Sequence, residues 1–526
     1  MGAVSARAER LAALGAREWD LVVIGGGISG AGVAQQAARA GWSVALVERH
    51  DFAWGTSSRS SKLVHGGLRY LKEGDIKTTL HSVHERQRLL HEAPELVQPQ
   101  AFLFADCRGR KPGRWLFQLG LTIYDVMAGQ RGHFHADLAR TQALEPGLAP
   151  PGLRGSLVFT DAKTDDARLV QRVLMEAERD GALTLNYAGV EALRLEAGKV
   201  VGLHVRDAIG GGEVAVRARA VVNATGAWAD RLRGDVGAAP LLRPLRGSHL
   251  IVPHARLPVS HAISSMHPRD GRPVFFYPWE GVTLVGTTDL DHREDLEAEA
   301  AITQEEVDYL LATVHDQFPA AGIGEDDVVS CFAGVRPVID DGQAEASKAT
   351  RDHVVRDESA LVTLTGGKLT TFRLMAQDAL ALAAPHAGRA FTRDDGPLFA
   401  AGAPLPAWDE SVRRRLLGRY GRRAAELCAG AAAADLAPVP GTGTLWLELS
   451  VAARAEAVAH LDDLLLRRTR LGLLLPRGGL DHLERIRALC EPHLAWGEAG
   501  WQAETDRYRA LIARCYTLPR QRGALQ

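Results

Sequence analysis

Cysteine is scarce in this chain, and its spacing excludes several classes of protein. Five cysteines occur among 526 residues, and no two of them form a C-x-x-C pair. Disulfide frameworks, structural zinc sites and iron–sulfur clusters need cysteines in denser groups. His133 and His135 share a face of an expected strand, but no third ligand follows at metal spacing. We therefore expect a protein of a reducing compartment with no bound metal.

The chain also lacks a long apolar run and an excess of either charge. The sequence contains no uninterrupted run of about 18 apolar residues, so a membrane-spanning helix is not expected. Lys and Arg (62) nearly balance Asp and Glu (64), so the net charge of −2 creates no broad field that would attract nucleic acid. Residues 1–18 lack the apolar centre of a signal peptide and predict a loose lead-in helix. These features indicate a cytoplasmic protein without a nucleic-acid partner.

A strand, a glycine turn, a helix and a second strand open the chain. The apolar run at 20–24 is followed by GGGISG at 25–30, and the small residues of 31–40 favour a closely packed helix. Residues 43–48 predict the second strand. This is a βαβ unit, whose parallel strands place a ligand at their carboxyl ends.

The glycine turn has the G-x-G-x-x-G form of a dinucleotide site. Gly25 permits the tight turn, Gly27 lets the backbone approach a pyrophosphate, and Gly30 lets the helix pack closely on the strand. Glu48 stands at the end of the second strand, where a carboxylate accepts a hydrogen bond from a ribose hydroxyl. By itself this pattern does not distinguish NAD from FAD.

Two later turns distinguish the two cofactors. Residues 223–228 follow a strand with a second small-residue turn, and residues 366–371 open a helix whose amide dipoles would face a flavin. An enclosed flavin explains three dispersed glycine turns, whereas a diffusing nicotinamide needs one. The sequence therefore favours FAD.

Strands and helices alternate further along the chain. Strands are predicted at 183–187, 200–206, 220–223, 274–277 and 283–286, and helices at 167–180 and 303–317. Residues 396–407, rich in Pro, Gly and Ala, predict a linker, and 408–518 has mostly helical periodicity. We expect nucleotide-binding segments interrupted by a substrate-binding sheet and followed by a helical domain.

Several motifs resemble those of one enzyme family. GTSSRSSKLVHGGLRYL at 55–71 resembles the hallmark segment of the FAD-dependent, aerobic and quinone-linked glycerol-3-phosphate dehydrogenases. RGSHLIVP (246–253), GTTD (286–289), GVRP (334–337), TRD (350–352) and GGKLTTFR (366–373) match that family's motifs in the same order. The resemblance covers 19–400 and extends more loosely through DLLLRRTRLG at 463–472. Trp54, just before the hallmark segment, departs from the resemblance, because relatives usually carry a small residue there.

The resemblance implies an α/β fold with a glutathione-reductase-like FAD domain, an interleaved antiparallel-sheet substrate domain and a C-terminal helical domain. The expected FAD-binding segments are 19–85, 160–245 and 335–395, the substrate-binding segments are 86–159 and 246–334, the linker is 396–407 and the helical domain is 408–526. It also implies oxidation of sn-glycerol 3-phosphate to dihydroxyacetone phosphate by hydride transfer to FAD, with electrons passed to a membrane quinone. A peripheral enzyme on the inner face of the cell membrane, and a possible homodimer, are expected accordingly.

The motifs supply candidate site residues for this reaction. Arg69, Arg336 and Lys368 are the expected clamps for the substrate and its phosphate, because arginine binds phosphate oxygens bidentately and lysine acts as a point charge. His249 is the candidate general base, although a histidine beside a strand also suits a structural role. Tyr70 either bonds the substrate or packs. The expected cofactor contacts are Gly25, Gly27, Gly30, Glu48, Thr56, Ser57, Ser58, Ser61, Lys62, Leu63, His65, Gly66, Gly67, Val190, Ala224, Thr225, Gly226, Gly367, Lys368, Leu369 and Thr370.

The same residues also fit other functions. A glycerol-3-phosphate oxidase would pass the electrons to O₂ and make peroxide, but the chain has no obvious long insertion between Gly334 and Gly366. An amine or amino-acid oxidase and a non-catalytic flavoprotein are further possibilities on the same scaffold. Two basic segments, 108–121 and 411–423, are candidates for contact with anionic lipid, and each also reads as a solvated helix face.

Overall fold

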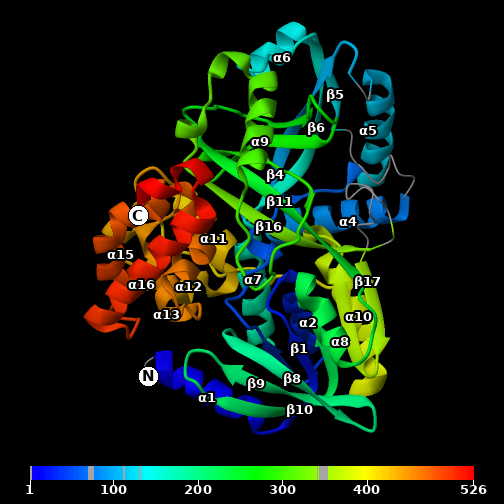
Figure 1. Cartoon of the computed structure of the whole chain (residues 1–526), viewed down its shortest axis with the longest axis vertical. Helices are drawn as coiled ribbons and strands as arrows, with labels where there is room; N and C mark the ends of the chain where they lie inside the picture. The colour runs from blue at the N-terminus through cyan, green and yellow to red at the C-terminus, as the bar shows by residue number, and fades with distance from the viewer. Residues whose placement is uncertain are drawn as a thin grey trace.

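The computed structural model describes residues 3–68, 76–110, 113–129, 132–340, 342 and 353–525. Two sheets and a C-terminal group of helices make up the molecule (Figure 1). The first sheet lies in the lower half of Figure 1 and the second in the upper half, and the C-terminal helices cover one side of both.

The first sheet is built on parallel strands. Its order is β17 (His353–Glu358), β18 (Leu361–Gly366), β10 (Glu213–Asn223), β1 (Glu18–Ile24), β2 (Val44–Val47) and β7 (Leu183–Leu185), with β9 (Lys199–Asp207) and β8 (Ala188–Glu196) continuing antiparallel from β10. β18, β10, β1, β2 and β7 run parallel. β1, β2 and β18 are almost wholly buried, which fits the continuous apolar runs that predicted β1 and β2.

Helices cover the first sheet on one face. α2 (Ile28–Arg39), α7 (Asp166–Arg179) and α10 (Phe372–Ala387) share one apolar core with the strands. α8 (Ala229–Asp235) lies beside β18 and β8. β1 leads into α2 and β18 leads toward α10, and these parallel strands place their carboxyl ends at the same edge of the sheet, so that edge is where a ligand is expected.

The second sheet is mostly antiparallel. Its order is β15 (Leu290–Asp291), β11 (Leu242–Pro253), β14 (Val282–Gly286), β13 (Pro273–Trp279), β12 (Ala262–Met266), β4 (Val97–Cys107), β6 (Leu153–Thr164) and β3 (Leu63–Val64), with β16 (Ser330–Ile339) beside β11 and β5 (Phe134–Asp137) beside β6. β12 and β4 form a parallel pair inside it. α4 (Ile76–Glu92), α5 (Arg114–Ala128), α6 (Leu138–Leu144) and α9 (Gln304–Gln317) surround the sheet. The expected α/β architecture with an interleaved antiparallel sheet is confirmed. The expected boundaries between the domain segments remain a prediction. Three of them, at 159/160, 245/246 and 334/335, fall within the strands β6, β11 and β16.

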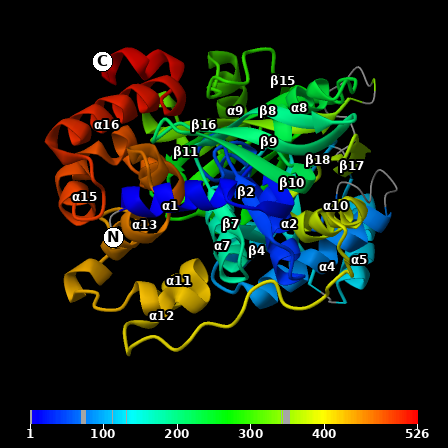
Figure 2. The same cartoon turned by 90° about the horizontal axis from the view of Figure 1, so that it is seen from below.

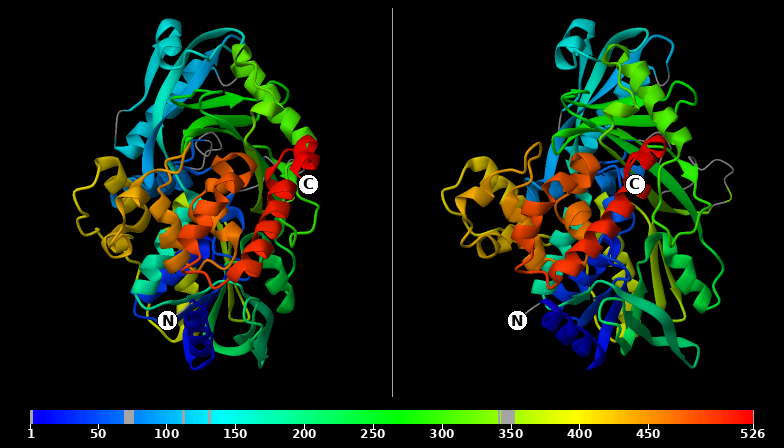
Figure 3. Two further views of the ribbon diagram at one scale, coloured as in Figure 1. Left: turned by 90° about the vertical axis from the view of Figure 1, so that its left-hand side faces the viewer. Right: turned by 60° about the vertical axis from the view of Figure 1, so that its left-hand side comes forward.

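The C-terminal helices lie across the junction of the two sheets (Figure 3). They are α11 (Glu410–Tyr420), α12 (Ala424–Leu427), α13 (Trp446–Ala455), a π-helical turn η9 (Asp463–Arg468), α14 (Leu471–Leu474), α15 (Leu483–Cys490) and α16 (Gly497–Leu511). Residues 396–407 contain no helix or strand, and Figure 2 shows the chain crossing there from α10 to α11. Among the described helices, none combines the length and the apolar character needed to cross a bilayer.

The N-terminal helix differs from the loose lead-in that the sequence predicted. α1 (Ala3–Gly15) is anchored by Arg7, which donates to Asp207 Oδ1 at 2.6 Å and to the carbonyl oxygen of Asn186 at 2.7 Å. Leu14 is fully buried. A helix was expected here, but the expectation that it is loose was wrong because its partners lie 179 and 200 residues away, beyond the reach of local pattern.

Candidate functional site

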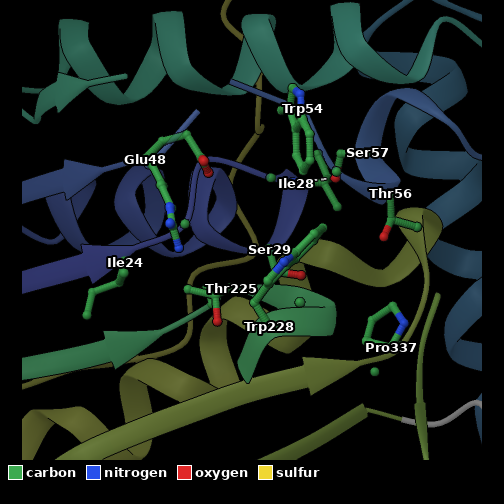
Figure 4. Close-up of a pocket in the computed structure, with 18 of the residues that line it drawn as sticks. Ile24, Ile28, Ser29, Glu48, Trp54, Thr56, Ser57, Thr225, Trp228 and Pro337 are labelled. Atoms are coloured by element: carbon green, nitrogen blue, oxygen red, sulfur yellow. Dashed lines mark hydrogen bonds between the residues drawn. The ribbon is translucent and has the colours of Figure 1, made fainter. Parts of the chain in front are cut away.

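A cavity opens at the carboxyl ends of β1, β2 and β10, where the βαβ unit predicted a ligand. Its volume is about 1300 Å³ including its open mouth. Figure 4 shows Glu48, Trp54, Trp228 and Pro337 around this space. Strands of both sheets contribute to the lining, since Pro337 belongs to β16.

The glycine turn after β1 has the close contacts that its motif predicts. Gly25 has a φ of +112°, and a Cβ there would lie 2.5 Å from the carbonyl oxygen of Ala224. A Cβ on Gly30 would lie 1.9 Å from the carbonyl oxygen of Gly25. Ser57 closes the turn from the other side, because its Oγ accepts from the backbone N–H of Ile28 at 3.0 Å. The Ser57 hydroxyl has no acceptor within the part of the chain that the structure describes, so it is able to donate to an anion at the start of α2.

Glu48 is fixed by two backbone donors at the end of β2. One carboxylate oxygen accepts from the N–H of Gly26 at 2.6 Å and the other from the N–H of His50 at 2.8 Å. Burial raises the pKa of Glu48, although both backbone donors oppose that rise. The side chain lines the cavity at the height where a ribose hydroxyl is expected to donate.

The opposite wall comes from the turns after β10 and β18. Thr225 and Gly226 begin a 3₁₀ turn η2 (Gly226–Trp228), and Thr365 Oγ1 donates to the carbonyl oxygen of Gly226 at 3.2 Å. Lys368 precedes the short 3₁₀ turn η6 (Leu369–Thr371) that leads into α10, and its Nζ donates to Ser82 Oγ of α4 at 3.2 Å. The three glycine turns predicted from the sequence therefore meet around one cavity.

His249 lies on β11 in a fully enclosed position. Its Nε2 lies 2.9 Å from Ser61 Oγ, and its ring stacks on Phe332 at a centroid distance of 4.6 Å. Nδ1 is buried and has no hydrogen-bond partner among the described residues. Burial, together with the positive charges of Lys62 and Arg336, holds the pKa of His249 well below its usual value of 6.5. The imidazole is therefore neutral at neutral pH, as a proton acceptor must be.

Arg336 lies on β16, the neighbour of β11, and its positive charge acts on His249. Its guanidinium donates to Asp289 Oδ1 at 2.8 Å and to Thr287 Oγ1 at 3.0 Å. A Cβ on Gly247 would lie 1.9 Å from the Arg336 guanidinium. The glycine of the RGSH motif thus leaves the room that the arginine occupies, a role that the sequence did not reveal.

The hallmark segment is divided between the cavity and the protein interior. Lys62 is fully buried and its Nζ donates to Asp166 and to the carbonyl oxygen of Ser58, each at 3.0 Å. The N–H of Gly66 donates to Tyr124 Oη at 2.9 Å and to Asp161 at 3.1 Å. Arg69 and Tyr70 lie outside the described residues.

The structure sorts the expected cofactor contacts into two groups. Those that line the cavity are Gly25, Gly27, Glu48, Thr56, Ser57, Val190, Ala224, Thr225, Gly226, Gly367, Lys368 and Leu369. Those outside its lining are Gly30, Ser58, Ser61, Lys62, Leu63, His65, Gly66, Gly67 and Thr370. Most of the second group belongs to β3 and to the residues on either side of it. Contact of this group with the cofactor remains a prediction.

Two aromatic walls of the cavity had no predicted role. Trp54 stacks on His50 at a centroid distance of 4.1 Å, and its ring lies 5.7 Å from that of Trp228. Burial and the charges of Arg49, Arg467 and Arg59 lower the pKa of His50 to about 4. The departure at Trp54 therefore adds a flat apolar wall to the cavity, stacked on a neutral imidazole.

Comparison with known proteins gives consistent matches over most of the chain. The family model "FAD dependent oxidoreductase" matches residues 20–392, and "C-terminal domain of alpha-glycerophosphate oxidase" matches residues 360–500. An aerobic glycerol-3-phosphate dehydrogenase of Staphylococcus aureus is 32% identical over 94% of both chains.

Solved structures agree with these matches. The glycerol-3-phosphate dehydrogenase of Bacillus halodurans, complexed with FAD, has a TM-score of 0.77 at 28% identity and covers 96% of both chains. The L-α-glycerophosphate oxidase of Mycoplasma pneumoniae, with FAD bound, has a TM-score of 0.59 at 19% identity and covers 74% of this chain and all of its own. At that identity the second likeness shows the fold alone.

Proposed function

The chain belongs to the family of FAD-dependent glycerol-3-phosphate dehydrogenases, and from this premise we propose that it oxidises sn-glycerol 3-phosphate to dihydroxyacetone phosphate and passes the electrons to a membrane quinone. The observation that carries the proposal is a neutral, buried His249 beside the cationic Arg336. Neither side chain lines the cavity, but Pro337, the residue after Arg336, and Lys368 both do. A small phosphorylated alcohol needs these groups: a base for the hydroxyl proton and cations for the phosphate.

FAD is the cofactor of this chain, and the cavity fits it. A Cβ on Gly25 would collide with the carbonyl oxygen of Ala224, and a Cβ on Gly27 would crowd Ser57 Oγ at 3.0 Å. Without these atoms the backbone at the start of α2 is open to a pyrophosphate. Glu48, Thr225 and Lys368 line the same space. When bound, FAD supplies the hydride acceptor.

His249 is the proposed general base of the reaction. If Nε2–H donates to Ser61 Oγ, the lone pair of Nδ1 is left to take the proton of the substrate hydroxyl. Arg336 and Lys368 hold the phosphate end, and the hydrogen bonds of Arg336 to Asp289 and Thr287 set the direction of its fork. Arg69 and Tyr70 are the remaining proposed substrate-binding residues, and both lie outside the described part of the chain.

Reduction of the flavin by the substrate tests the oxidation step directly. Adding glycerol 3-phosphate to the FAD-loaded protein under anaerobic conditions should bleach the visible flavin absorption. Glycerol, which lacks the phosphate, is the matched control and should bleach it far more slowly. A flavin spectrum that glycerol 3-phosphate leaves unchanged would rule out the proposed substrate.

The electron acceptor is tested separately, because relatives of both kinds match this chain. The aerobic dehydrogenase match and the absence of a long insertion between Gly334 and Gly366 support a quinone, whereas the oxidase-named family model supports oxygen. A soluble quinone analogue should restore turnover under argon. Stoichiometric peroxide release in air at the full turnover rate would identify an oxidase instead.

The surface of α5 supports peripheral contact with the inner face of the membrane. One side of this helix packs inward through Leu121 and Tyr124. The other exposes Trp115 (74%), Leu116 (65%), Leu119 (59%) and Val126 (76%), and Ile76 of α4 adds to the exposed apolar surface. Apolar side chains of this size on an exposed helix face, with Arg114 at its first position and Arg108 in the turn after β4, suit an interfacial helix on anionic lipid.

The second basic segment, 411–423, does not have this character. Arg413, Arg414, Arg415, Arg419 and Arg423 each form an ion pair with a carboxylate of the protein. We therefore assign the lipid contact to α5. Leu116→Glu should abolish sedimentation with vesicles of anionic phospholipid, while Leu195→Glu, at an exposed leucine of β8, should leave it unchanged. If both variants sediment with the vesicles to the same extent, α5 is not the lipid-contacting helix.

A further inference from the structure

The C-terminal domain sends three arginines into the half of the molecule that holds the cofactor cavity. Arg467 and Arg468 end the turn η9, and Arg470 follows two residues later. Their exposed fractions are 1%, 0% and 2%. Guanidinium groups buried to this degree need carboxylate and carbonyl partners on every side. Some of these partners belong to the C-terminal domain itself, and the others belong to the segment 51–62 and to the start of α7.

Arg467 and Arg468 hold the first end of the segment. Arg467 Nε donates to Asp51 Oδ2 at 2.5 Å, and the two terminal nitrogens of Arg468 donate to Asp51 at 2.7 and 2.8 Å. Asn186 adds a further donor at 3.0 Å. Burial alone would raise the pKa of Asp51, but the two arginines lower it, so the carboxylate stays charged and accepts from all of these donors.

Arg470 holds the other end of the segment. It donates to the carbonyl oxygen of Ser58 at 3.2 Å, to Asp165 at 2.9 Å and to Asp166. Asp166 in turn accepts from the N–H of Ser60 at 3.0 Å and from the Ser60 hydroxyl at 2.7 Å. A C-terminal arginine therefore fixes residues 58–60 both directly and through Asp166.

The residues between the two ends form a wall of the cofactor cavity. Trp54, Gly55, Thr56 and Ser57 all line it. Ser57 is bonded to the start of α2, so a shift of this segment would also disturb the glycine turn. Fixing a short segment from both ends restricts the wall to one position, and a preformed site loses less free energy when its ligand binds.

We infer that the C-terminal helical domain positions the segment 51–62 for FAD, with Arg468 and Arg470 as positioning residues. Docking of a helical domain does not by itself require these contacts. Arg415, for example, joins the same domain to the second sheet through Glu280 at 2.9 Å and bonds Glu448 within its own domain, and it has no contact with residues 51–62. The domain therefore also has attachments away from the cofactor segment, through Glu280 and through Ser330, whose hydroxyl donates to the carbonyl oxygen of Leu473.

The inference concerns FAD affinity and is tested without substrate. Arg468→Met and Arg470→Met each remove one buried guanidinium at the segment, and Arg415→Met removes one at the other attachment. FAD affinity is measured by titrating the flavin-free protein, following the quenching of tryptophan fluorescence, and thermal unfolding is recorded for each variant. Because glycerol 3-phosphate takes no part, failure here is distinct from failure of the proposed reaction.

The dissociation constant of FAD should rise about ten- to hundredfold in Arg468→Met and Arg470→Met, the range expected for coupling between two sites of one protein. Arg415→Met should lower the unfolding temperature and leave the dissociation constant within about twofold of the parent, inside the scatter of independent sites. Equal affinities in all three variants, or an affinity loss in Arg415→Met as large as in the others, would overturn the inference. If the methionine variants do not fold, Arg468→Lys and Arg470→Lys decide it, since lysine keeps the charge but is unable to reproduce the forked contacts.

Discussion

Gly286 offers a way to displace His249 without altering it. The two residues face each other across β14 and β11, and an alanine Cβ at 286 would lie 2.1 Å from His249 Cδ2 and 2.7 Å from Nε2. Because non-bonded carbon atoms settle at about 3.5–4.0 Å, the ring would have to move by about 1.5 Å. Phe332 stacks on the ring from the neighbouring strand, so no space exists for a simple retreat.

The expected effect of Gly286→Ala is therefore a misplaced base in a folded protein. The contact of 2.9 Å to Ser61 would open beyond hydrogen-bond distance, and the tautomer of His249 would no longer be fixed. A positioned general base contributes about 10²–10⁴ to a rate, so flavin reduction by glycerol 3-phosphate should slow by that factor. Overpacking costs about 1–3 kcal/mol of stability, which a domain of ordinary stability tolerates.

Anaerobic stopped-flow measurement of flavin bleaching at saturating substrate gives the rate constant. His249→Gln should slow the reaction comparably, and the double variant should be no slower than the worse single one, because both changes act on one ring. Gly324→Ala, where an added Cβ meets nothing within 4 Å, is the control and should react at the parent rate. A Gly286→Ala protein that holds FAD and reacts within about threefold of the parent would remove His249 from the mechanism, since a mere 1 Å misplacement is able to cost about 10²-fold.

Three further outcomes follow from the site. Arg336→Ala should lower kcat/KM for glycerol 3-phosphate about 10- to 150-fold, the worth of one charge-assisted hydrogen bond, while FAD stays bound; an unchanged kcat/KM would exclude the clamp. The pKa of His249 in the folded protein lies below the value of 6.5 in the unfolded chain. As the pH drops below 6.5 the unfolded chain binds a proton that the folded protein does not, so the free energy of unfolding decreases. In urea titrations His249→Gln should lose less stability than the parent between pH 6.5 and 5, by up to about 1.4 kcal/mol per pH unit, and identical pH profiles would contradict this. Gly25→Ala should abolish FAD binding, because its Cβ would strike the carbonyl oxygen of Ala224, and purification of a yellow variant protein would disprove it.

Local sequence pattern predicted the nucleotide half of the fold well. The strand expected at 20–24 is β1, the helix expected at 167–180 is α7, and both match within two residues. These elements have apolar runs or helical periodicity, and the glycine turns between them have a fixed spacing. Their meeting at one cavity was predictable because carboxyl ends of parallel strands share one edge of a sheet.

Long-range contacts were beyond sequence reasoning. Asp165 caps α7 by accepting from the N–H of Arg168, a local contact that neighbouring sequence is able to predict. Its ion pair with Arg470 spans 305 residues and left no local signal. In the same way, Gly247 and Gly286 read as ordinary strand residues until the side chains that occupy their missing Cβ positions are known.

The buried charges between the C-terminal helices and the first sheet are better explained by the directionality of their hydrogen bonds than by a gain in the stability of the fold. Taking carboxylates and guanidinium groups out of water has a large desolvation cost, and well-packed apolar residues would attach a domain at least as firmly. An apolar surface, however, tolerates small slides, whereas Asp51 accepts from Arg467, Arg468 and Asn186 in fixed directions. A segment that forms one wall of a cofactor cavity has to be held within about 0.5 Å, and hydrogen bonds from several elements provide that precision. The requirement for a defined cavity wall therefore accounts for the ionic contacts at 51–62. If these contacts served only to attach the domain, apolar side chains such as leucine would be expected instead.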